Sequence, residues 1–315
     1  MGRQFDDLML GSIELFCLSA EHASFTAAAT AAGLTPPAVS RAIGRLEQRL
    51  GVRLFTRTTR RVQLTEAGRV YFQQCRQALN QLVEAEREVG GQQRVPSGTL
   101  RISVPTPLGH YRILPLLPVF RARHPEVQLD VHVSDRNVDL TADGYDLVVR
   151  GRTPPDSRFV ARKLLDAELV VVATPGYLAR TRTPRTPADL AAHDCLQFLL
   201  PRNGQPVPWL FRENGADVER PTRGAIACAE HLLAAVTLAR LGGGVLQTYR
   251  FIVEGDLARG DLVELLTDFG GRSRPFSLIH AGGPHMPLRL RVFIDFLVDA
   301  FRQNSWRSRT NAGAA

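Results

Sequence analysis

Hydrophobic residues recur at helical spacing through the first 50 residues, and they predict three short helices. The first covers residues 6–22. The second begins after Ser24, a residue type that favours the N-cap, and it ends at Gly33, where glycine tolerates a left-handed conformation. The third covers residues 35–50. Three helices in this order, with a short turn between the last two, predict a small helical domain.

The third predicted helix has one apolar face and one polar, basic face. Thr35 is its predicted N-cap, and Pro36 takes the first helical position, where a missing N–H has no consequence. The inward stripe consists of Ala38, Val39, Ala42, Ile43, Leu46 and Leu50, and the outer face carries Ser40, Arg41, Arg45 and Gln48. A small-residue helix followed by a short turn and such a capped helix is the helix-turn-helix pattern.

A wing and a long helix are predicted next. Two short strands, 53–55 and 62–64, flank a basic tip that runs from Arg57 to Arg61. One helix then covers 66–89, and at a rise of about 1.5 Å per residue it spans on the order of 35 Å. Its apolar residues alternate between spacings of four and three: Tyr71, Cys75, Ala78, Leu82, Ala85 and Val89. This narrow seam favours pairing with a second copy of the chain, and packing against the following domain is the alternative.

Beyond residue 90 the pattern changes to alternating strands and helices, which predicts an α/β domain. Strands are expected near 99–104, 127–133, 146–149, 168–173, 195–199, 222–227 and 244–248, and helices near 110–123, 136–142, 230–241 and 288–302. Because strands resume with new helices after residue 160, we expect two lobes. The whole chain is therefore an α+β multidomain protein.

The predicted domains follow from these boundaries. They are a winged helix-turn-helix domain over 1–65, a linker helix over 66–90, a hinge over 91–98, a two-lobed domain over 99–303 and a disordered tail over 304–315. Lobe 1 is expected at about 99–165 and 270–303, and lobe 2 at about 166–269.

Composition and charge narrow the class of protein. With 44% hydrophobic and 22% charged residues, the 315-residue chain is a typical soluble globular protein. Most of its net charge of +8 lies between Thr35 and Thr65, where seven arginines accompany one acid, Glu47. This segment suits a polyanionic partner, although a solvated basic face explains the charge equally well. No signal peptide and no apolar run of 18 residues occur, so we expect a cytoplasmic protein with no membrane partner.

Three other classes of protein compete with a DNA-binding regulator. An enzyme is disfavoured because no G-x-S-x-G, H-E-x-x-H, P-loop or G-x-G-x-x-G motif occurs, and we predict no catalytic residue. The eight histidines are scattered and the four cysteines lie far apart, so no metal site and no cofactor are predicted. A solute-binding protein would carry no DNA-binding segment. A redox-sensing regulator that uses Cys195 and Cys228 remains an alternative.

Several short sequence motifs along the chain resemble those of a known protein family. The first third contains Ser24-Phe-Thr-Ala-Ala-Ala, Thr35-Pro-Pro-Ala-Val-Ser-Arg, Ile43-Gly-Arg-Leu-Glu, Leu50-Gly-Val-Arg-Leu-Phe-Thr-Arg and Leu64-Thr-Glu-Ala-Gly. Later come Ser134-Asp-Arg-Asn-Val-Asp-Leu, Gly144-Tyr-Asp-Leu-Val-Val-Arg, Ala173-Thr-Pro-Gly-Tyr-Leu, Gly242-Gly-Gly-Val-Leu and Arg291-Val-Phe-Ile-Asp-Phe-Leu. Over about residues 6–302 the chain resembles LysR-type transcriptional regulators.

The resemblance implies a winged helix-turn-helix, a linker helix that pairs two chains, and an effector domain with two lobes similar to periplasmic binding proteins. It also implies a homotetramer whose grip on double-stranded promoter DNA changes when a small-molecule effector binds between the lobes. RNA polymerase is a candidate partner.

The predicted DNA contacts combine this resemblance with residue chemistry. The family's pattern carries base contacts onto Pro36, Pro37, Ser40 and Arg41. Arg41 can donate to O6 and N7 of a guanine, which is worth about 1–3 kcal/mol of discrimination. Family members often have a polar residue at the position of Pro36. Proline can make only an apolar contact there, such as with the methyl group of a thymine. The full predicted set is Ser24, Thr26, Thr35, Pro36, Pro37, Ser40, Arg41, Arg45, Arg57, Arg60 and Arg61, the wing arginines facing the DNA backbone or minor groove and the first two residues facing phosphates.

The predicted effector site lies at the turn after the first strand of the second domain. Free backbone N–H groups and the Thr106 hydroxyl can hold an organic anion where a helix begins. From the family's contact positions we expect Thr106, His110, Arg150 and Phe198 to line the site. The alternative is that Thr106 only caps the helix and that Arg150 forms a structural ion pair.

Overall fold

A computed structural model describes residues 7–58, 61–89, 95–136, 140, 143–151, 159–200, 203–282 and 286–303. The chain divides into two compact units, one formed by Met1–Arg94 with Thr141–Gly144 and the other by the remaining residues. The predicted tail, residues 91–94 of the predicted hinge and most of the predicted helix over 136–142 lie outside the described residues.

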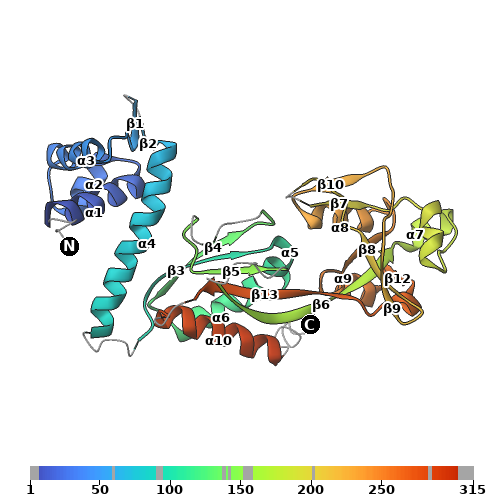
Figure 1. The fold of residues 1–315 in the computed structure, drawn as a ribbon. Helices are drawn as coiled ribbons and strands as arrows, with labels where there is room; N and C mark the ends of the chain where they lie inside the picture. The colour runs from blue at the N-terminus through green and yellow to red at the C-terminus, as the bar shows by residue number, and fades with distance from the viewer. Residues whose placement is uncertain are drawn as a thin grey trace. The chain divides into compact units, whose positions relative to one another are not determined.

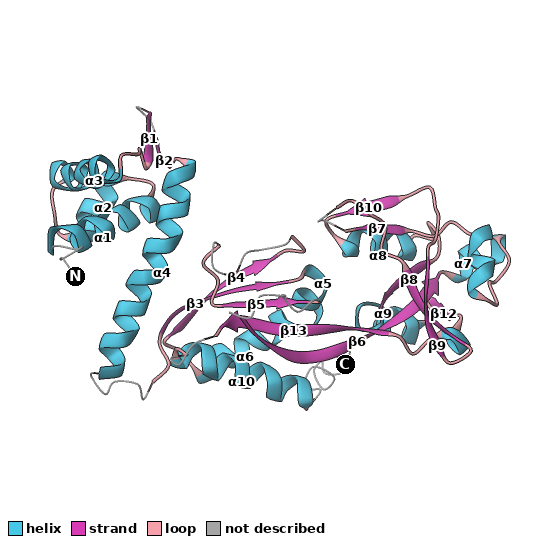
Figure 2. Ribbon diagram, in the orientation of Figure 1, coloured by secondary structure: helices cyan, strands magenta, loops and turns pink. Residues whose placement is uncertain are grey.

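The first unit contains the predicted helix-turn-helix, wing and long helix in the predicted order (Figures 1 and 2). Its elements are α1 (Asp7–His22), α2 (Phe25–Ala32), α3 (Pro36–Leu50), β1 (Phe55–Thr58), β2 (Arg61–Leu64) and α4 (Glu66–Val89). The Ser24 hydroxyl accepts the Ala27 N–H at 3.2 Å, which caps α2, and Gly33 ends that helix at φ 66°. The core of the unit surrounds the fully buried ring of Phe16, which lies 5.4 Å from the ring of Phe55.

The wing strands differ from the prediction. The structure pairs Phe55–Thr58 with Arg61–Leu64, whereas the sequence suggested 53–55 and 62–64. Leu54 is fully buried, and its backbone bonds to Glu47 of α3 and to Thr65 rather than across the hairpin, so the first strand starts at Phe55, two residues later than predicted. As a result, Arg57 and Arg61 belong to the strands and not to the tip.

The second unit is an α/β domain with more strands than the sequence pattern predicted. Its strands are β3 (Gly98–Val104), β4 (Val127–Val133), β5 (Leu147–Arg150), β6 (Phe159–Ala173), β7 (Gln197–Leu199), β8 (Trp209–Glu213), β9 (Ala216–Arg220), β10 (Ala227–Ala229), β11 (Leu246–Tyr249), β12 (Val263–Leu265) and β13 (Ser273–Ala281). Its helices are α5 (Thr106–Leu108), α6 (Leu117–Arg123), α7 (Pro175–Arg180), α8 (Leu232–Arg240), α9 (Arg250–Arg259) and α10 (Leu288–Arg302). The strand expected over 222–227 is wrong, because only 227–229 pair with a neighbour, in parallel with β7.

One long strand, β6, runs through both parts of this domain. Seven strands form a sheet in the order β11-β6-β13-β5-β3-β4, with β12 also paired to β6. From Phe159 to Glu168, β6 pairs with β13, and from Leu169 onward it pairs with β11 and β12. The strand therefore links one lobe to the other, and the change of partner falls close to the predicted lobe boundary at 165–166.

Helices cover the sheet of the first lobe. Figure 1 shows α6 and α10 on the same side of that sheet, and the rings of Phe120 and Phe293 meet edge to face with centroids 4.9 Å apart. Both rings are fully buried, so the last helix of the chain packs against one of the first helices of the domain. In this way α10 packs against the sheet of the first lobe.

Candidate DNA-binding surface and effector site

The outer face of α3 carries the side chains predicted to read DNA. Val39, Ile43 and Leu46 are buried on the inner face, while Arg41 and Arg45 are exposed. Ser40 is half-buried beside them, and Thr35, Pro36 and Pro37 at the start of the helix are also exposed. The predicted residues on α3 therefore share one accessible, basic surface.

Thr35 occupies the N-cap position of α3, but its side chain makes no capping hydrogen bond. The predicted N-cap position is therefore confirmed, and the missing side-chain bond has a local reason, because a cap oxygen accepts from the second or third helical N–H. Pro37 at the second position has no N–H, and the Ala38 N–H donates to the Thr35 carbonyl at 2.9 Å. The Thr35 hydroxyl is thus left for solvent or a phosphate.

Glu47, the single acid of the basic segment, holds the wing against α3. Its side chain is buried, and Oε1 accepts the backbone N–H of Leu54 at 2.8 Å and that of Phe55 at 3.1 Å. Leu54 is also bonded from the other side, since its carbonyl accepts the Thr65 N–H at 2.9 Å. Sequence reasoning missed this role; the signal was a lone carboxylate on the apolar side of a basic helix.

The remaining predicted contacts of the first unit differ in how far the structure describes them. The Ser24 hydroxyl oxygen accepts the hydrogen bond that caps α2, and Thr26, the second residue of that helix, is exposed. Arg57 and Arg61 lie in β1 and β2, but their side chains, like all of Arg60, are outside the described parts.

The predicted seam of α4 divides into two parts. Cys75 is buried and Tyr71 packs beside it in the core of their own unit, so these two residues are covered by their own chain. Further along, Ala78 and Leu82 are exposed, Leu82 with 49% of its surface. The side chains of Ala85 and Val89 lie outside the description.

In the second unit, Thr106 follows β3 at the predicted turn and is buried. Its backbone N–H donates to Oδ1 of Asp135 at 2.8 Å, so the N–H predicted to hold an anion is already bonded to a carboxylate of the chain. The capping alternative is also wrong, because Pro105 is the N-cap and Thr106 the first helical residue. Burial raises the pKa of Asp135, opposed by this hydrogen bond and by the charges of His231 and Arg150.

Arg150, at the end of β5, acts on the same carboxylate through its charge, and it forms no ion pair with any residue that the structure describes. Its Nη2 donates to Oγ of Ser103 at 2.8 Å, and its Nη1 donates to the Val149 carbonyl at 2.7 Å. Burial lowers the pKa of Arg150, and the charge of Asp135 opposes that change. The ion-pair alternative is therefore replaced by hydrogen bonds to neutral oxygens.

The other two predicted effector residues are placed differently. His110 is exposed on the π-helical turn Gly109–Ile113, and Phe198 is half-buried on β7. Thr106 is hydrogen-bonded to Asp135, and Arg150 acts on Asp135 through its charge, whereas none of the contacts among the described residues joins this group to His110 or Phe198. Asp135 was missed by sequence reasoning, although it stands in one of the quoted motifs.

Residues of the second lobe face this group across the lobe junction. Arg136 Nη2 lies 3.2 Å from Oε1 of Glu230, and His231 stands at the N-cap of α8. On another side of the junction, Arg112 donates to both carboxylate oxygens of Glu254, at 2.9 and 3.0 Å. Two sets of charged contacts thus connect the lobes.

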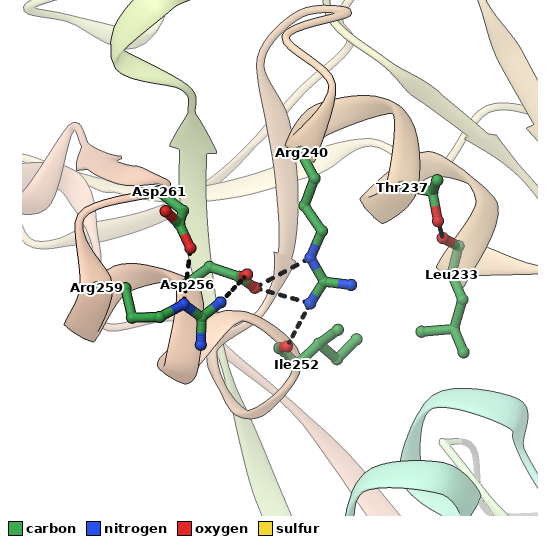
Figure 3. A network of polar contacts seen from close by, with 7 residues as sticks. All are labelled: Leu233, Thr237, Arg240, Ile252, Asp256, Arg259 and Asp261. Carbon is green, nitrogen blue, oxygen red and sulfur yellow. Dashed lines mark hydrogen bonds and ion pairs between the residues drawn. The ribbon is translucent and has the colours of Figure 1, made fainter. Parts of the chain in front are cut away.

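A polar network fixes α8 to α9 within the second lobe (Figure 3). Arg240 Nη2 donates to Oδ2 of the buried Asp256 at 2.7 Å, and Arg259 Nη2 donates to Oδ1 of the same carboxylate at 2.8 Å. Arg240 also donates to the Ile252 carbonyl at 3.3 Å. Because Asp256 is paired on both oxygens, the Arg240 end of α8 is tied to α9.

The two cysteines of the redox alternative are poorly placed to bond. In the parallel β7–β10 pair Cys228 lies opposite Phe198, so Cys195 is three residues, or about 10 Å, further along. Disulfide formation needs Cα atoms within about 7 Å. Burial raises the pKa of Cys195 to about 12, which suppresses the reactive thiolate. The geometry disfavours a redox pair.

A winged helix-turn-helix joined to a two-lobed α/β domain defines the class of ligand-responsive transcriptional regulators. Comparison with protein-family models identifies the family within this class. Residues 10–69 match the bacterial regulatory helix-turn-helix protein, lysR family, and residues 93–302 match the LysR substrate binding domain. The chain belongs to the LysR family of transcriptional regulators, which bind DNA and are not enzymes.

Known relatives match over nearly the whole chain. The probable HTH-type transcriptional regulator LtrA of Klebsiella pneumoniae is 35% identical over 92% of this chain and 94% of its own length. The solved structure of CrgA, a LysR-type transcriptional regulator from Neisseria meningitidis, is 31% identical, covers 92% of this chain and 98% of that one, and has a TM-score of 0.60. The full-length Vibrio cholerae virulence activator AphB covers the same shares at 27% identity and a TM-score of 0.60.

Two further findings concern only the residues that the structure describes. Among them, no group of three or more His, Cys, Asp or Glu side chains is arranged to hold a metal ion. None of their helices combines the length and apolar character needed to cross a membrane.

Proposed function

We propose that α3 reads operator DNA in the major groove, with Arg41 as the principal base-reading residue. One observation supports this proposal: Arg41 and Arg45 are exposed on the outer face of α3, whereas Val39 and Ile43 are buried on its inner face. A helix anchored by a buried stripe presents its outer side chains in a fixed direction, as base recognition requires. Pro36 and Pro37 add only apolar contacts at the start of the helix, so Arg41 and Ser40 carry most of the hydrogen bonding.

The experiment first uses the full chain to select operators from random DNA duplexes. The affinity of each variant is then measured for the selected operator and for operators with single base substitutions. Arg41→Ala should lose affinity for the selected sequence and lose discrimination at one base pair, by about 1–3 kcal/mol. Arg45→Ala is the comparison variant, an exposed arginine one turn further along the same face, and it should weaken binding without losing discrimination at that base pair. An unchanged base preference in Arg41→Ala would remove Arg41 from base recognition.

We further propose that α4 pairs two chains through Ala78 and Leu82, which are exposed on the predicted seam. Leu82→Glu places a charge on the seam, and it should shift the protein from dimers or tetramers toward monomers in sedimentation velocity. Val83→Glu is the control, because Val83 is similarly exposed but one residue off the seam. Equal effects of the two substitutions would refute a seam-specific contact.

The effector site that we propose lies at the lobe junction around Thr106, Asp135 and Arg150. It is supported by the hydrogen bond from Thr106 to Asp135 and by the mutual electrostatic effect of Asp135 and Arg150. A ligand that favours one arrangement of the lobes would alter DNA binding by shifting the population between two assemblies. Isothermal titration with Arg150→Gln and Thr106→Val proteins tests the site, and unchanged effector affinity in both would exclude it.

A further inference from the structure

The lobe junction contains buried polar atoms that have no hydrogen-bond partner. Among the described residues these include Oδ2 of Asp135, Nε of Arg150 and Oγ1 of Thr106. The Thr106 hydroxyl is close enough to Asp135 to lower the pKa of that carboxyl, but no hydrogen bond of ordinary geometry joins them. Buried polar groups in folded proteins are almost always satisfied, so a cluster of unsatisfied ones calls for a molecule that completes it.

The three atoms belong to one connected group of side chains. Oδ1 of Asp135 accepts the Thr106 N–H at 2.8 Å, and Arg150 Nη2 donates to Ser103, three residues before Thr106. The charge of Arg150 opposes the rise that burial causes in the pKa of Asp135. Arg150 Nη2 also donates to the carbonyl of Arg136, the residue after Asp135, at 3.1 Å, so one unpartnered acceptor, Oδ2 of Asp135, and one unpartnered donor, Nε of Arg150, belong to the same group of contacts.

The charges of this group select against ionised ligands. A carboxylate placed here would meet the carboxylate of Asp135, which already holds the Thr106 N–H. A cation would meet the guanidinium of Arg150, whose Nη atoms are bonded to neutral oxygens of Ser103 and Val149. A neutral group with an N–H next to a C=O satisfies both residues without either repulsion.

We propose that the effector presents a neutral carboxamide-type group to this site, with its N–H donating to Asp135 Oδ2 and its carbonyl accepting from Arg150 Nε. This rests on the proposed effector site and replaces the organic anion expected from the sequence. The ion pair between Arg136 and Glu230 does not prevent a ligand from entering. Arg136 and Glu230 are both more than half exposed, and such a surface pair contributes only about 0.2–1 kcal/mol.

Asp135→Asn gives a decisive test because it reverses the hydrogen bonding of one atom. The asparagine carbonyl still accepts the Thr106 N–H, whereas its amide nitrogen presents donors where Oδ2 accepted. Two donors, the new amide and Arg150 Nε, then favour a carboxylate. Asp295→Asn is the control, since Asp295 is an exposed carboxylate on α10.

The probes are two matched pairs, benzamide with benzoate and nicotinamide with nicotinate, tested by thermal shift and calorimetry on the full chain. The original protein and Asp295→Asn should bind the amide about tenfold to a hundredfold more tightly than the acid, and Asp135→Asn should reverse that order. A preference for the acid in the original protein, an unaltered preference in Asp135→Asn, or no binding of any probe by either protein overturns the proposal.

Binding to the selected operators is measured in parallel. If DNA binding persists while the amide preference fails, only the ligand class is refuted. If the original protein binds no operator, the proposed function fails on its own.

Discussion

Removing the Glu47 carboxylate should loosen the wing from the recognition helix. Glu47→Ala leaves the N–H groups of Leu54 and Phe55 without their acceptor, and Leu54 is fully buried while Phe55 is 2% exposed, so water cannot replace it. Each hydrogen bond to a charged group contributes about 1.5–3 kcal/mol. Relief from burying the charge offsets part of two such bonds, and we expect a net loss of about 3 kcal/mol.

Hydrogen exchange of the full chain measures this loss at the two amides themselves. A loss of about 3 kcal/mol should speed exchange at Leu54 and Phe55 on the order of 100-fold. Glu47→Gln is the matched control, because an amide oxygen in the same place still accepts both N–H groups, with a loss of about 1 kcal/mol. Affinity for selected operators should fall in Glu47→Ala more than in Glu47→Gln, since only the first releases the wing.

Two results would refute this reasoning. If exchange at both amides in Glu47→Ala is unchanged, the carboxylate does not hold the wing. If Glu47→Gln is as damaging as Glu47→Ala, the charge and not the hydrogen bonding is responsible.

Three further predictions follow from other contacts. Gly68→Ala should destabilise the first unit by about 1–3 kcal/mol in urea unfolding, because a Cβ there would lie 2.0 Å from the Leu54 carbonyl oxygen. Gly44→Ala, with nothing near its Cβ, should instead be neutral or stabilising. Arg61→Ala should weaken binding to all DNA sequences alike and reduce the salt slope of log Kd by about 1; a sequence-selective loss would contradict a backbone contact. Finally, burial raises the pKa of Asp135 above its ordinary value of 3.8, so the folded protein loses stability as pH rises through that range. The Tm of Asp135→Asn minus that of the original protein should therefore grow from acid toward neutral pH, and a constant difference would argue against this cause.

Local signals in the sequence predicted the helices of the first unit well. Ser24, Gly33 and Pro36 act within a few residues of their own positions, and the structure places each at the helix boundary expected. The last helix, over 288–302, was also predicted correctly because its apolar face repeats at helical spacing for four turns.

The pairing of strands that lie far apart in the sequence could not be predicted from such local signals. The first half of β6 contains Arg162, Lys163 and Asp166, so it lacks the apolar run of a buried strand and was predicted only from residue 168. It forms a strand because β13, more than 100 residues later, pairs with it along its length. The β13 strand and the β8–β9 hairpin were not predicted at all.

The candidate site shows the same division between local and distant interactions. Thr106 and Arg150 were predicted from the contact positions that the family resemblance implies, and Thr106 also from its place at the turn after a strand. Asp135 reaches Thr106 across 29 residues, and Glu47 reaches the wing across a turn, so neither contact follows from periodicity. The Asp135 carboxylate accepts the N–H that was predicted to hold an anion, and the Glu47 carboxylate holds the wing to α3.

The hydrogen bonds of the Leu54 backbone join α3, the wing and α4, so the first unit can move as a rigid body. Its N–H is held by Glu47 of α3, its carbonyl accepts from Thr65 at the start of α4, and Gly68 lets α4 approach that carbonyl closely. Recognition helix, wing and linker helix thus share one fully bonded residue. If two chains pair through α4 as proposed, a change in that pairing cannot bend the wing away from α3 without breaking these buried bonds. It must instead turn each DNA-binding unit as a whole, which alters the spacing between the two reading helices while leaving the base contacts of each helix intact.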